Sequence, residues 1–212
     1  DENWAAITKP MTSSENELYL LNMKTGEKKI ISNSTSKGKY EITGFSRDNQ
    51  HAYYITDAGK EFGYLAQYDI ATGEKKVLYE TNWDVMFSSL SEHEKYRVIG
   101  INEDGKNKLI MQEAATGKAV EFPEIPDGDI LGLNIAPSEK LMRLTVGTSK
   151  APNNIYVYNL ETKELKKLTE SGPDRPVAMI VQEAANVANS PIALRGNIHN
   201  KGEVVPPYYS VK

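Results

Sequence analysis

The residue types that most often carry chemistry are few in this sequence and lie far apart. The sequence contains no cysteine, and its three histidines are His51, His93 and His199. A chain without cysteine can form no disulfide, no thiolate nucleophile and no cysteine metal site. No two histidines form a His-x-x-x-His pair, and zinc needs several ligands that converge on one point. We therefore expect no metal site.

Motifs for covalent catalysis and for nucleotide binding are missing as well. A serine nucleophile of the Gly-x-Ser-x-Gly type stands on a strained strand-to-helix turn, and no such pentapeptide occurs. Neither Gly-x-Gly-x-x-Gly nor a Walker loop is present. The acidic stretch 102–107 lacks the spacing and the terminal glutamate of a calcium loop, so we interpret it as a hairpin turn. We predict no catalytic, cofactor-binding or metal-binding residue and no cofactor.

Composition and charge exclude two classes of partner. Hydrophobic residues make up 39% of the 212 residues, charged residues make up 25%, and the formal net charge is -4. A mildly acidic chain with scattered lysines lacks the basic footprint of a nucleic-acid-binding protein. No apolar run approaches the roughly 20 residues that span a bilayer. We expect no nucleic acid partner and no membrane insertion, and the cytoplasm and the periplasm both remain open.

A repeat organises the elements that must position any functional side chain. Four segments align without gaps, and each begins with a run rich in aliphatic and aromatic residues, which favours a half-buried strand. Each run reaches a polar residue that recurs every 44 to 47 positions and is followed three residues later by Thr-Gly or Thr-Lys. The four segments are Glu17–Gly26, Tyr64–Gly73, Lys108–Gly117 and Asn154–Lys163.

The chemistry of these turns explains the pattern. Asn or Asp at the start of a turn can bond the backbone two residues on, and Gly at its end takes a positive φ without steric cost. Lys163 replaces this glycine in the last copy, so we expect that turn to differ or to carry strain. A strand follows each turn and completes a hairpin. These strands are predicted at Lys28–Ile31, Lys75–Tyr79, Ala119–Phe122 and Glu164–Thr169.

A second marker shows that each unit has four strands. An apolar residue that ends a strand recurs every 45 positions, at Phe45, Leu90 and Ile135, and a polar turn follows each one. The next strands are predicted at Ala52–Thr56, Tyr96–Asn102 and Met142–Thr148. Four antiparallel strands in about 45 residues are typical of a propeller blade. We predict an all-β fold, a β-propeller of four-stranded antiparallel blades.

The repeat gives three complete blades and one incomplete blade. The blade cores are predicted at about 1–32, 42–80, 85–122 and 130–169, within a propeller region at 1–172. The first blade lacks its innermost strand, so Trp4–Thr8 is its second strand.

The tail at 173–212 departs from the repeat but keeps one in-register strand at 177–181, followed by a short helical pattern at 182–188. The strand at 177–181 could complete the first blade and close a four-bladed ring. We expect instead that the chain is part of a larger propeller, because an open blade edge is an aggregation liability.

Two side-chain types recur outside these markers. Glu-Lys-Lys clusters accompany the outer strands at 27–29 and 74–76, and a related cluster lies at 164–167. Charged outer edges discourage strand addition by neighbouring molecules, and we interpret the clusters in that way. The 12 tyrosines are expected mostly to pack between blades with their hydroxyl groups reaching solvent.

Particular stretches resemble a known family. Residues Phe62–Gly73, with Asn82–Val85 and Ile101–Gly105, resemble the propeller of the prolyl oligopeptidase and acylaminoacyl-peptidase family of serine peptidases. Asn154–Asn159, running into Lys167–Ser171, is similar to the last blade before that family's α/β-hydrolase domain. The likeness covers about residues 1–171, and TolB-like periplasmic propellers use similar blades. Relatives commonly place Ser-Pro-Asp-Gly in the inner turn, where this chain has Ser-Arg-Asp-Asn, Ser-Glu-His-Glu and Ala-Pro-Ser-Glu.

The resemblance implies a function without catalytic residues in this chain. It implies a propeller domain that gates the access of peptide substrates to an α/β-hydrolase domain of the same parent protein, absent from this chain. The expected partners are that hydrolase domain and peptide substrates. The alternative is a TolB-like propeller scaffold for protein–protein interaction in the cell envelope. A metal- or carbohydrate-dependent lyase propeller is disfavoured because the histidines are not clustered.

Overall fold

The computed structural model describes residues 3–32, 35–125, 129–148 and 151–171, together with four two-residue strands after residue 193. All elements in these ranges are β-strands. The same ranges contain no helix with the length and apolar character that crossing a membrane requires. The chain divides into two compact units, residues 1–122 and 123–212, and each has its own sheets.

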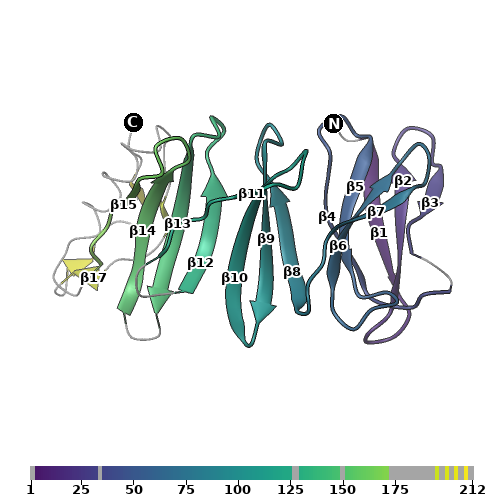
Figure 1. Ribbon diagram of the computed structural model, residues 1–212, viewed down its shortest axis with the longest axis horizontal. Helices are drawn as coiled ribbons and strands as arrows, with labels where there is room; N and C mark the ends of the chain where they lie inside the picture. Colours follow the sequence, from purple (N-terminus) through teal and green to yellow (C-terminus); the bar gives the residue numbers. More distant parts are fainter. Residues whose placement is uncertain are drawn as a thin grey trace. The chain divides into compact units, whose positions relative to one another are not determined.

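The first unit contains three antiparallel sheets in which consecutive strands are neighbours (Figure 1). The first sheet has three strands, β1 (Trp4–Pro10), β2 (Asn16–Asn22) and β3 (Lys28–Ile30). The second has four, β4 (Tyr40–Phe45), β5 (His51–Thr56), β6 (Tyr64–Asp69) and β7 (Lys75–Tyr79). The third has four, β8 (Asp84–Leu90), β9 (Tyr96–Glu103), β10 (Lys106–Glu113) and β11 (Ala119–Val120).

The second unit contains one four-stranded sheet of the same kind. Its strands are β12 (Asp129–Ile135), β13 (Leu141–Thr148), β14 (Ala151–Asn159) and β15 (Leu165–Lys167). Two small antiparallel pairs follow, β16 (Leu194–Arg195) with β19 (Tyr208–Tyr209) and β17 (His199–Asn200) with β18 (Glu203–Val204). The strand predicted at 177–181 and the helical pattern at 182–188 lie outside the described residues.

The predicted blades are confirmed as three four-stranded sheets and one three-stranded sheet. The missing strand of the first sheet is the innermost one, as predicted, because β1 pairs with β2 and has no neighbour on its other side among the described residues. The outer strands are shorter than predicted, since β11 ends at Val120 and β15 at Lys167. The predicted domain boundary at 172 lies among residues outside the described ranges and stays a prediction.

The core of the first unit lies between the faces of successive sheets. Leu18 and Leu20 from β2 pack with Ala52 and Tyr54 from β5, and all four are at most 3% exposed. A second cluster joins the next two sheets through Leu65, Val85, Ile99 and Ile101. Strand side chains alternate between two faces, so each middle strand contributes to both neighbouring interfaces.

The outer lysines have a role that the sequence interpretation missed. The ammonium group of Lys29 in β3 donates at 2.6 Å to the carbonyl of Ile70, the first residue after β6 of the second sheet. The ammonium group of Lys75 in β7 donates to the carbonyl of Ile31 after β3. Burial lowers the pKa of Lys75. The interpretation of these two lysines as edge protection alone is therefore incomplete, because they also join the first and second sheets.

The four Thr-Gly-type turns share one shape. In each, the amide of the last residue donates to the carbonyl of the first at 2.8 to 2.9 Å, and the pairs are Gly26–Asn22, Gly73–Asp69, Gly117–Glu113 and Lys163–Asn159. Lys163 has a φ of 64°, close to the 72–78° of the three glycines. Of the two expected outcomes, a different turn shape is wrong, and backbone strain at Lys163 is correct.

Replacing Lys163 with glycine is expected to raise the free energy of unfolding by about 0.5–1 kcal/mol, because only glycine occupies this backbone region without cost. The Lys163 ammonium lies 6.0 Å from the centre of the Tyr158 ring, so losing this weak contact keeps the gain modest. Urea denaturation of Lys163→Gly measures the change. Lys166→Gly in β15 is the control and should destabilise by a similar amount. A loss of stability in both variants would contradict the strain at Lys163.

Candidate functional site

The structure places the three histidines in three separate elements. His51 begins β5, His93 lies in the turn between β8 and β9, and His199 lies in β17. Within the described ranges, no three His, Cys, Asp or Glu side chains are grouped so that they could hold a metal ion. No catalytic, cofactor-binding or metal-binding residue was predicted, and that statement stays a prediction. The sites described below are therefore polar contacts and a groove.

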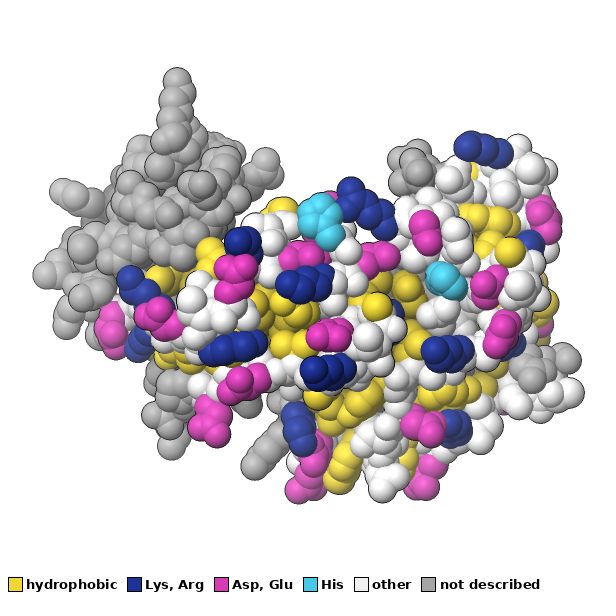
Figure 2. Space-filling model, turned by 45° about the horizontal axis from the view of Figure 1, so that its top comes forward, with side chains coloured by type: hydrophobic (Ala, Val, Ile, Leu, Met, Phe, Trp, Pro, Cys, Tyr) yellow, Lys and Arg dark blue, Asp and Glu magenta, His cyan; other side chains and the backbone are white. Residues whose placement is uncertain are grey.

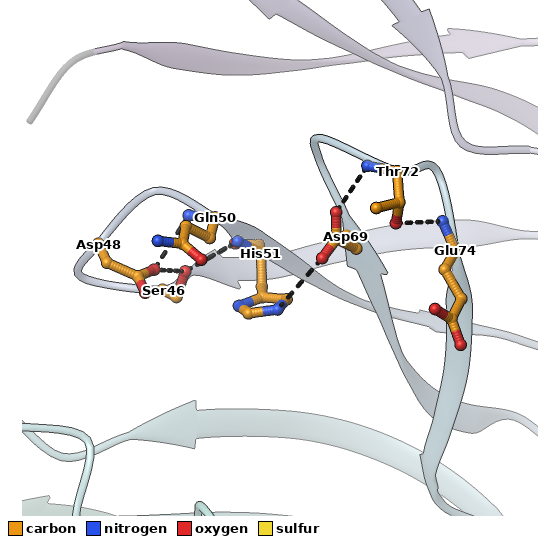
Figure 3. A network of polar contacts seen from close by, with 7 residues as sticks. All are labelled: Ser46, Asp48, Gln50, His51, Asp69, Thr72 and Glu74. Carbon is orange, nitrogen blue, oxygen red and sulfur yellow. Dashed lines mark hydrogen bonds and ion pairs between the residues drawn. The ribbon is translucent and has the colours of Figure 1, made fainter.

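A polar network joins two turns at one end of the second sheet (Figure 3). The Ser46 hydroxyl donates to Asp48 Oδ1 at 2.6 Å and accepts from the backbone amide of His51 at 2.9 Å. Asp48 Oδ1 also accepts from the backbone amide of Gln50 at 3.0 Å. The hydrogen bond from Ser46, followed by that from Gln50, lowers the pKa of Asp48. The Asp48 carboxylate thus holds the shape of the β4–β5 turn.

The second half of the network belongs to the turn between β6 and β7. Asp69 Oδ1 accepts from the backbone amide of Thr72 at 2.7 Å, which lowers the pKa of Asp69. The Thr72 hydroxyl accepts from the backbone amide of Glu74 at 3.2 Å. His51 Nε2 is 3.7 Å from Asp69 Oδ2, and this contact connects the two turns (Figure 3).

Ser46, His51 and Asp69 do not have the geometry of a catalytic triad. In a triad the histidine accepts the serine proton and a carboxylate orients the histidine. Here the Ser46 hydroxyl donates to Asp48, and it receives a hydrogen bond from the backbone of His51 rather than facing the imidazole. The network therefore fits a role in stabilising the turns.

The inner turns of the second and third sheets contact each other directly. The backbone amide of Arg47 donates to Glu94 Oε1 at 2.6 Å, and Arg47 Nη1 donates to His93 Nδ1 at 2.5 Å. These residues belong to Ser-Arg-Asp-Asn and Ser-Glu-His-Glu, the turns that depart from Ser-Pro-Asp-Gly. Glu94 also takes a φ of 59° where the family pattern has glycine. The departures thus provide a contact between two blades.

A buried arginine also joins the second and third sheets. Arg97 in β9 is 3% exposed, and its guanidinium carbon is 4.6 Å from the centre of the Tyr53 ring in β5. Burial lowers the pKa of Arg97 and raises that of Tyr53. The sequence reasoning missed this pair. The available signal was a single arginine in the otherwise apolar run Tyr96–Ile101, which indicates a side chain stacked or paired in the core.

A groove lies at the opposite end of the first and second sheets, along four connections between strands. It consists of two open hollows of about 420 Å³ each that share Lys60 and Glu61. Lys60 pairs with Glu80 and lies 4.4 Å from the centre of the Tyr64 ring, while Lys37 is 3.8 Å from Glu15. The remaining lining residues are Ser14, Gly38, Asp57, Gly59, Phe62, Thr81 and Asn82.

The groove carries both signs of charge, two lysines and four carboxylates, so its chemistry suits a polar ligand more than an apolar one. The face of the molecule in Figure 2 shows a similar mixture, with basic and acidic side chains interspersed and no large area of one sign. A mixed surface of this kind does not steer strongly charged ligands. No sequence pattern indicated the groove, because its residues come from polar connections that resemble ordinary loops.

Comparison with known proteins identifies the fold. No protein-family model and no curated protein matches the sequence. A solved prolyl endopeptidase superposes with a TM-score of 0.63 at 16% identity, over 79% of this chain and 24% of that chain. TolB from Acinetobacter baumannii superposes with a TM-score of 0.52 at 16% identity, over 80% of this chain and 41% of that chain. A putative TolB from Agrobacterium tumefaciens superposes with a TM-score of 0.56 at 12% identity, over 79% of this chain and 61% of that chain.

This chain spans less than two thirds of the length of each of these three proteins. Identities of 12–16% establish a common fold and leave function open. Together with the repeated antiparallel sheets, the superpositions show that the chain has the β-propeller fold, in a form shared with a prolyl endopeptidase and with TolB proteins.

Proposed function

We propose that this chain is a non-catalytic propeller region of a prolyl oligopeptidase-like serine peptidase, and that it gates the access of peptides to an α/β-hydrolase domain outside this chain. The observation that carries the proposal is the superposition on a prolyl endopeptidase over 79% of the chain, at a TM-score of 0.63. The sequence likeness at Phe62–Gly73 and the lack of a Gly-x-Ser-x-Gly elbow support the same assignment.

The proposed gating is steric. Sheets that share continuous cores, as the first three do, form a stiff body. A stiff body next to a catalytic cleft excludes folded proteins and admits short or unfolded peptides. The propeller itself then needs little affinity for the substrate, which agrees with a groove whose two lysines are each paired with a glutamate.

The purified chain is expected to show no hydrolysis of peptide p-nitroanilides, because it carries no nucleophile elbow. The complete gene product is expected to hydrolyse them and to react with a fluorophosphonate at a serine outside residues 1–212. Deleting the propeller from that product should raise the cleavage of folded proteins relative to short peptides. Hydrolysis by residues 1–212 that a serine-directed inhibitor abolishes would contradict the proposal.

A second candidate, a TolB-like scaffold for protein–protein interaction in the cell envelope, has one specific observation in its favour. The chain spans 41% and 61% of the two TolB proteins, compared with 24% of the prolyl endopeptidase. A gene product with a secretory signal and without a nucleophile elbow would favour this candidate. Cross-linking in intact cells should then capture the propeller together with an envelope protein.

A further inference from the structure

Two lysine side chains form a reciprocal joint between the first and second sheets. Lys29 in β3 donates to the carbonyl of Ile70 at 2.6 Å, and Lys75 in β7 donates to the carbonyl of Ile31. The two acceptors are the first residues after β6 and β3, and they are at most 4% exposed. Each ammonium group is thus held at the line where the two sheets meet.

The partners of Lys75 differ from those of most lysines in the described ranges. The lysines that have a carboxylate partner there are Lys9, Lys29, Lys37, Lys60, Lys108, Lys140 and Lys167. Lys75 instead has a backbone carbonyl as its acceptor. A carboxylate stabilises the ammonium form, whereas a carbonyl accepts an N–H from the ammonium group and from the neutral amine alike. Lys75 can therefore lose its proton and keep this hydrogen bond.

The titratable groups near Lys75 do not oppose the loss of that proton. Tyr68 stands opposite Lys75 on β6, and burial raises the pKa of Tyr68, so this side chain stays neutral. Glu27, on the strand side of the first sheet, lies 3.9 Å from the ammonium group of Lys29. Glu74 precedes Lys75 in the chain and forms no ion pair with it among the described residues.

Burial in the joint acts in the same direction. It lowers the pKa of Lys75, because part of the ammonium group is removed from water. The residue as a whole is still exposed at the start of β7. A lysine amine is a nucleophile only without its proton, and partial desolvation activates it for that reason. Lys75 thus combines a larger share of the reactive form with access for a small reagent.

The charges around the joint favour an anionic reagent. The clusters 27–29 and 74–76 each contain two lysines and one glutamate, and the reciprocal hydrogen bonds bring the two clusters together. A surplus of positive charge raises the local concentration of anions, and lysine is a common partner of phosphate groups. An acyl phosphate carries both an anionic group and an activated acyl carbon, so it is the class of acyl donor that suits this position.

We propose that Lys75 is a modification site at which an acyl phosphate transfers its acyl group to the side-chain amine. The unprotonated Nζ attacks the acyl carbon and forms a C–N bond. The bond from that carbon to the phosphate oxygen breaks, its electron pair leaves with phosphate, and the nitrogen releases a proton to water. The product amide has one N–H and no charge, so acylation weakens the Lys75 half of the joint. The proposal is independent of whether the parent protein is a peptidase or a scaffold.

The test compares the rates at which individual lysines of the folded 212-residue chain react with acetyl phosphate. After a short reaction the chain is unfolded, and the remaining amines are acetylated completely with deuterated acetic anhydride. The light-to-heavy ratio at each lysine, measured by mass spectrometry, gives its relative rate. Lys75 is expected to react about fivefold faster than Lys76, its exposed neighbour on the other face of β7, because a larger share of its amine is unprotonated.

The same reaction in guanidinium chloride is the first control. Unfolding separates the two sheets and exposes both lysines to water, so Lys75 and Lys76 should then react at rates within about twofold of each other. An excess at Lys75 that persists in the unfolded chain would overturn the proposal, because it would come from the local sequence and not from the joint.

Substitutions at Val77 supply the second control. Val77 is 45% exposed and lies two residues after Lys75, on the same face of β7. Val77→Glu gives Lys75 a carboxylate neighbour and should lower the ratio of the Lys75 rate to the Lys76 rate about threefold. Val77→Gln has nearly the same shape without the charge and should leave this ratio within about 1.5-fold of the unmodified chain. Equal ratios in the two variants, or a Lys75 rate no higher than that of Lys76 in the folded chain, would overturn the proposal.

Discussion

Replacing Gly38 with alanine is expected to lower the free energy of unfolding by about 2 kcal/mol, within the usual range for overpacked sites. A Cβ atom at this position would lie 2.8 Å from both the backbone nitrogen and the Cα of Ala58, and 2.5 Å from Asp57 Oδ1. These atoms cannot easily move, since Asp57 Oδ1 accepts from the amide of Lys39 at 2.7 Å and the Asp57 carbonyl accepts from the amide of Lys60 at 2.9 Å. The variant should therefore disturb the floor of the groove as well as stability.

Gly44→Ala is the matched control for this experiment. A Cβ atom at Gly44 would meet nothing within 4 Å, and its backbone has no positive φ. The alanine restricts the unfolded chain, so stability should stay unchanged or rise by about 0.5 kcal/mol. Urea denaturation followed by the fluorescence of Trp4 and Trp83 measures both variants. Equal losses in the two variants would mean that the close approach at Gly38 has no energetic consequence.

The strands and turns could be predicted from the sequence because local chemistry determines them. Every Thr-Gly-type turn depends on residues within five positions of one another, and the hydrogen bonds inside each turn follow from those residues. The stretch predicted to be a hairpin turn is confirmed as the two-residue connection between β9 and β10. Its residues Asp104 and Gly105 both have a positive φ, which matches the twist of the flanking strands.

The contacts between sheets could not be predicted in the same way. Lys29 reaches a carbonyl 41 residues away and Lys75 reaches one 44 residues away. Such distances follow from how the sheets pack, which a repeat of turn residues does not specify. A lysine that points into solvent at an outer edge and a lysine that joins two sheets have the same sequence signature. The interpretation of these residues as edge protection was therefore incomplete.

The groove and the contact between inner turns were missed for a related reason. The hollows around Lys60 lie on connections that share no pattern and are far apart in the sequence. Arg47 and His93 occupy positions where the family pattern has other residues, so the likeness to that family gave no information about them. Their pairing shows that departures from a repeat can carry specific contacts between neighbouring blades.

Replacing Arg97 with alanine is expected to lower the free energy of unfolding by about 2–3 kcal/mol. Two opposing effects determine this value. Removing the side chain leaves a cavity and loses the stacking on Tyr53, and a desolvated cation–π contact alone contributes up to about 2 kcal/mol. Removing the charge also relieves the cost of burying a guanidinium that is 3% exposed. A net loss of stability is expected because the lost packing and stacking outweigh the desolvation cost that the substitution removes.

Arg97→Met separates the two effects, because methionine keeps much of the volume and removes the charge. Its stability should lie within about 1 kcal/mol of the unmodified protein, since a well-packed apolar residue often replaces a buried ion without loss. Arg97→Lys should be less stable than Arg97→Met, because an ammonium group has no planar face to stack on Tyr53 and is more strongly hydrated. The order of stability of the alanine, methionine and lysine variants therefore shows whether the volume, the charge or the planar face of arginine matters at position 97.

A double-mutant cycle with Tyr53→Leu measures the stacking itself. The coupling between Arg97→Ala and Tyr53→Leu is expected to be about 1 kcal/mol, because the two side chains are in contact across two sheets at 4.6 Å. The cycle with Tyr79→Leu is the control, since Tyr79 lies in β7 and Arg97 makes its aromatic contact with Tyr53. A coupling near zero for Tyr53 would show that Arg97 acts only by filling space. A coupling found for Tyr53 and absent for Tyr79 would establish a specific contact between the second and third blades, one that depends on the aromatic ring and not only on the volume of the Arg97 side chain.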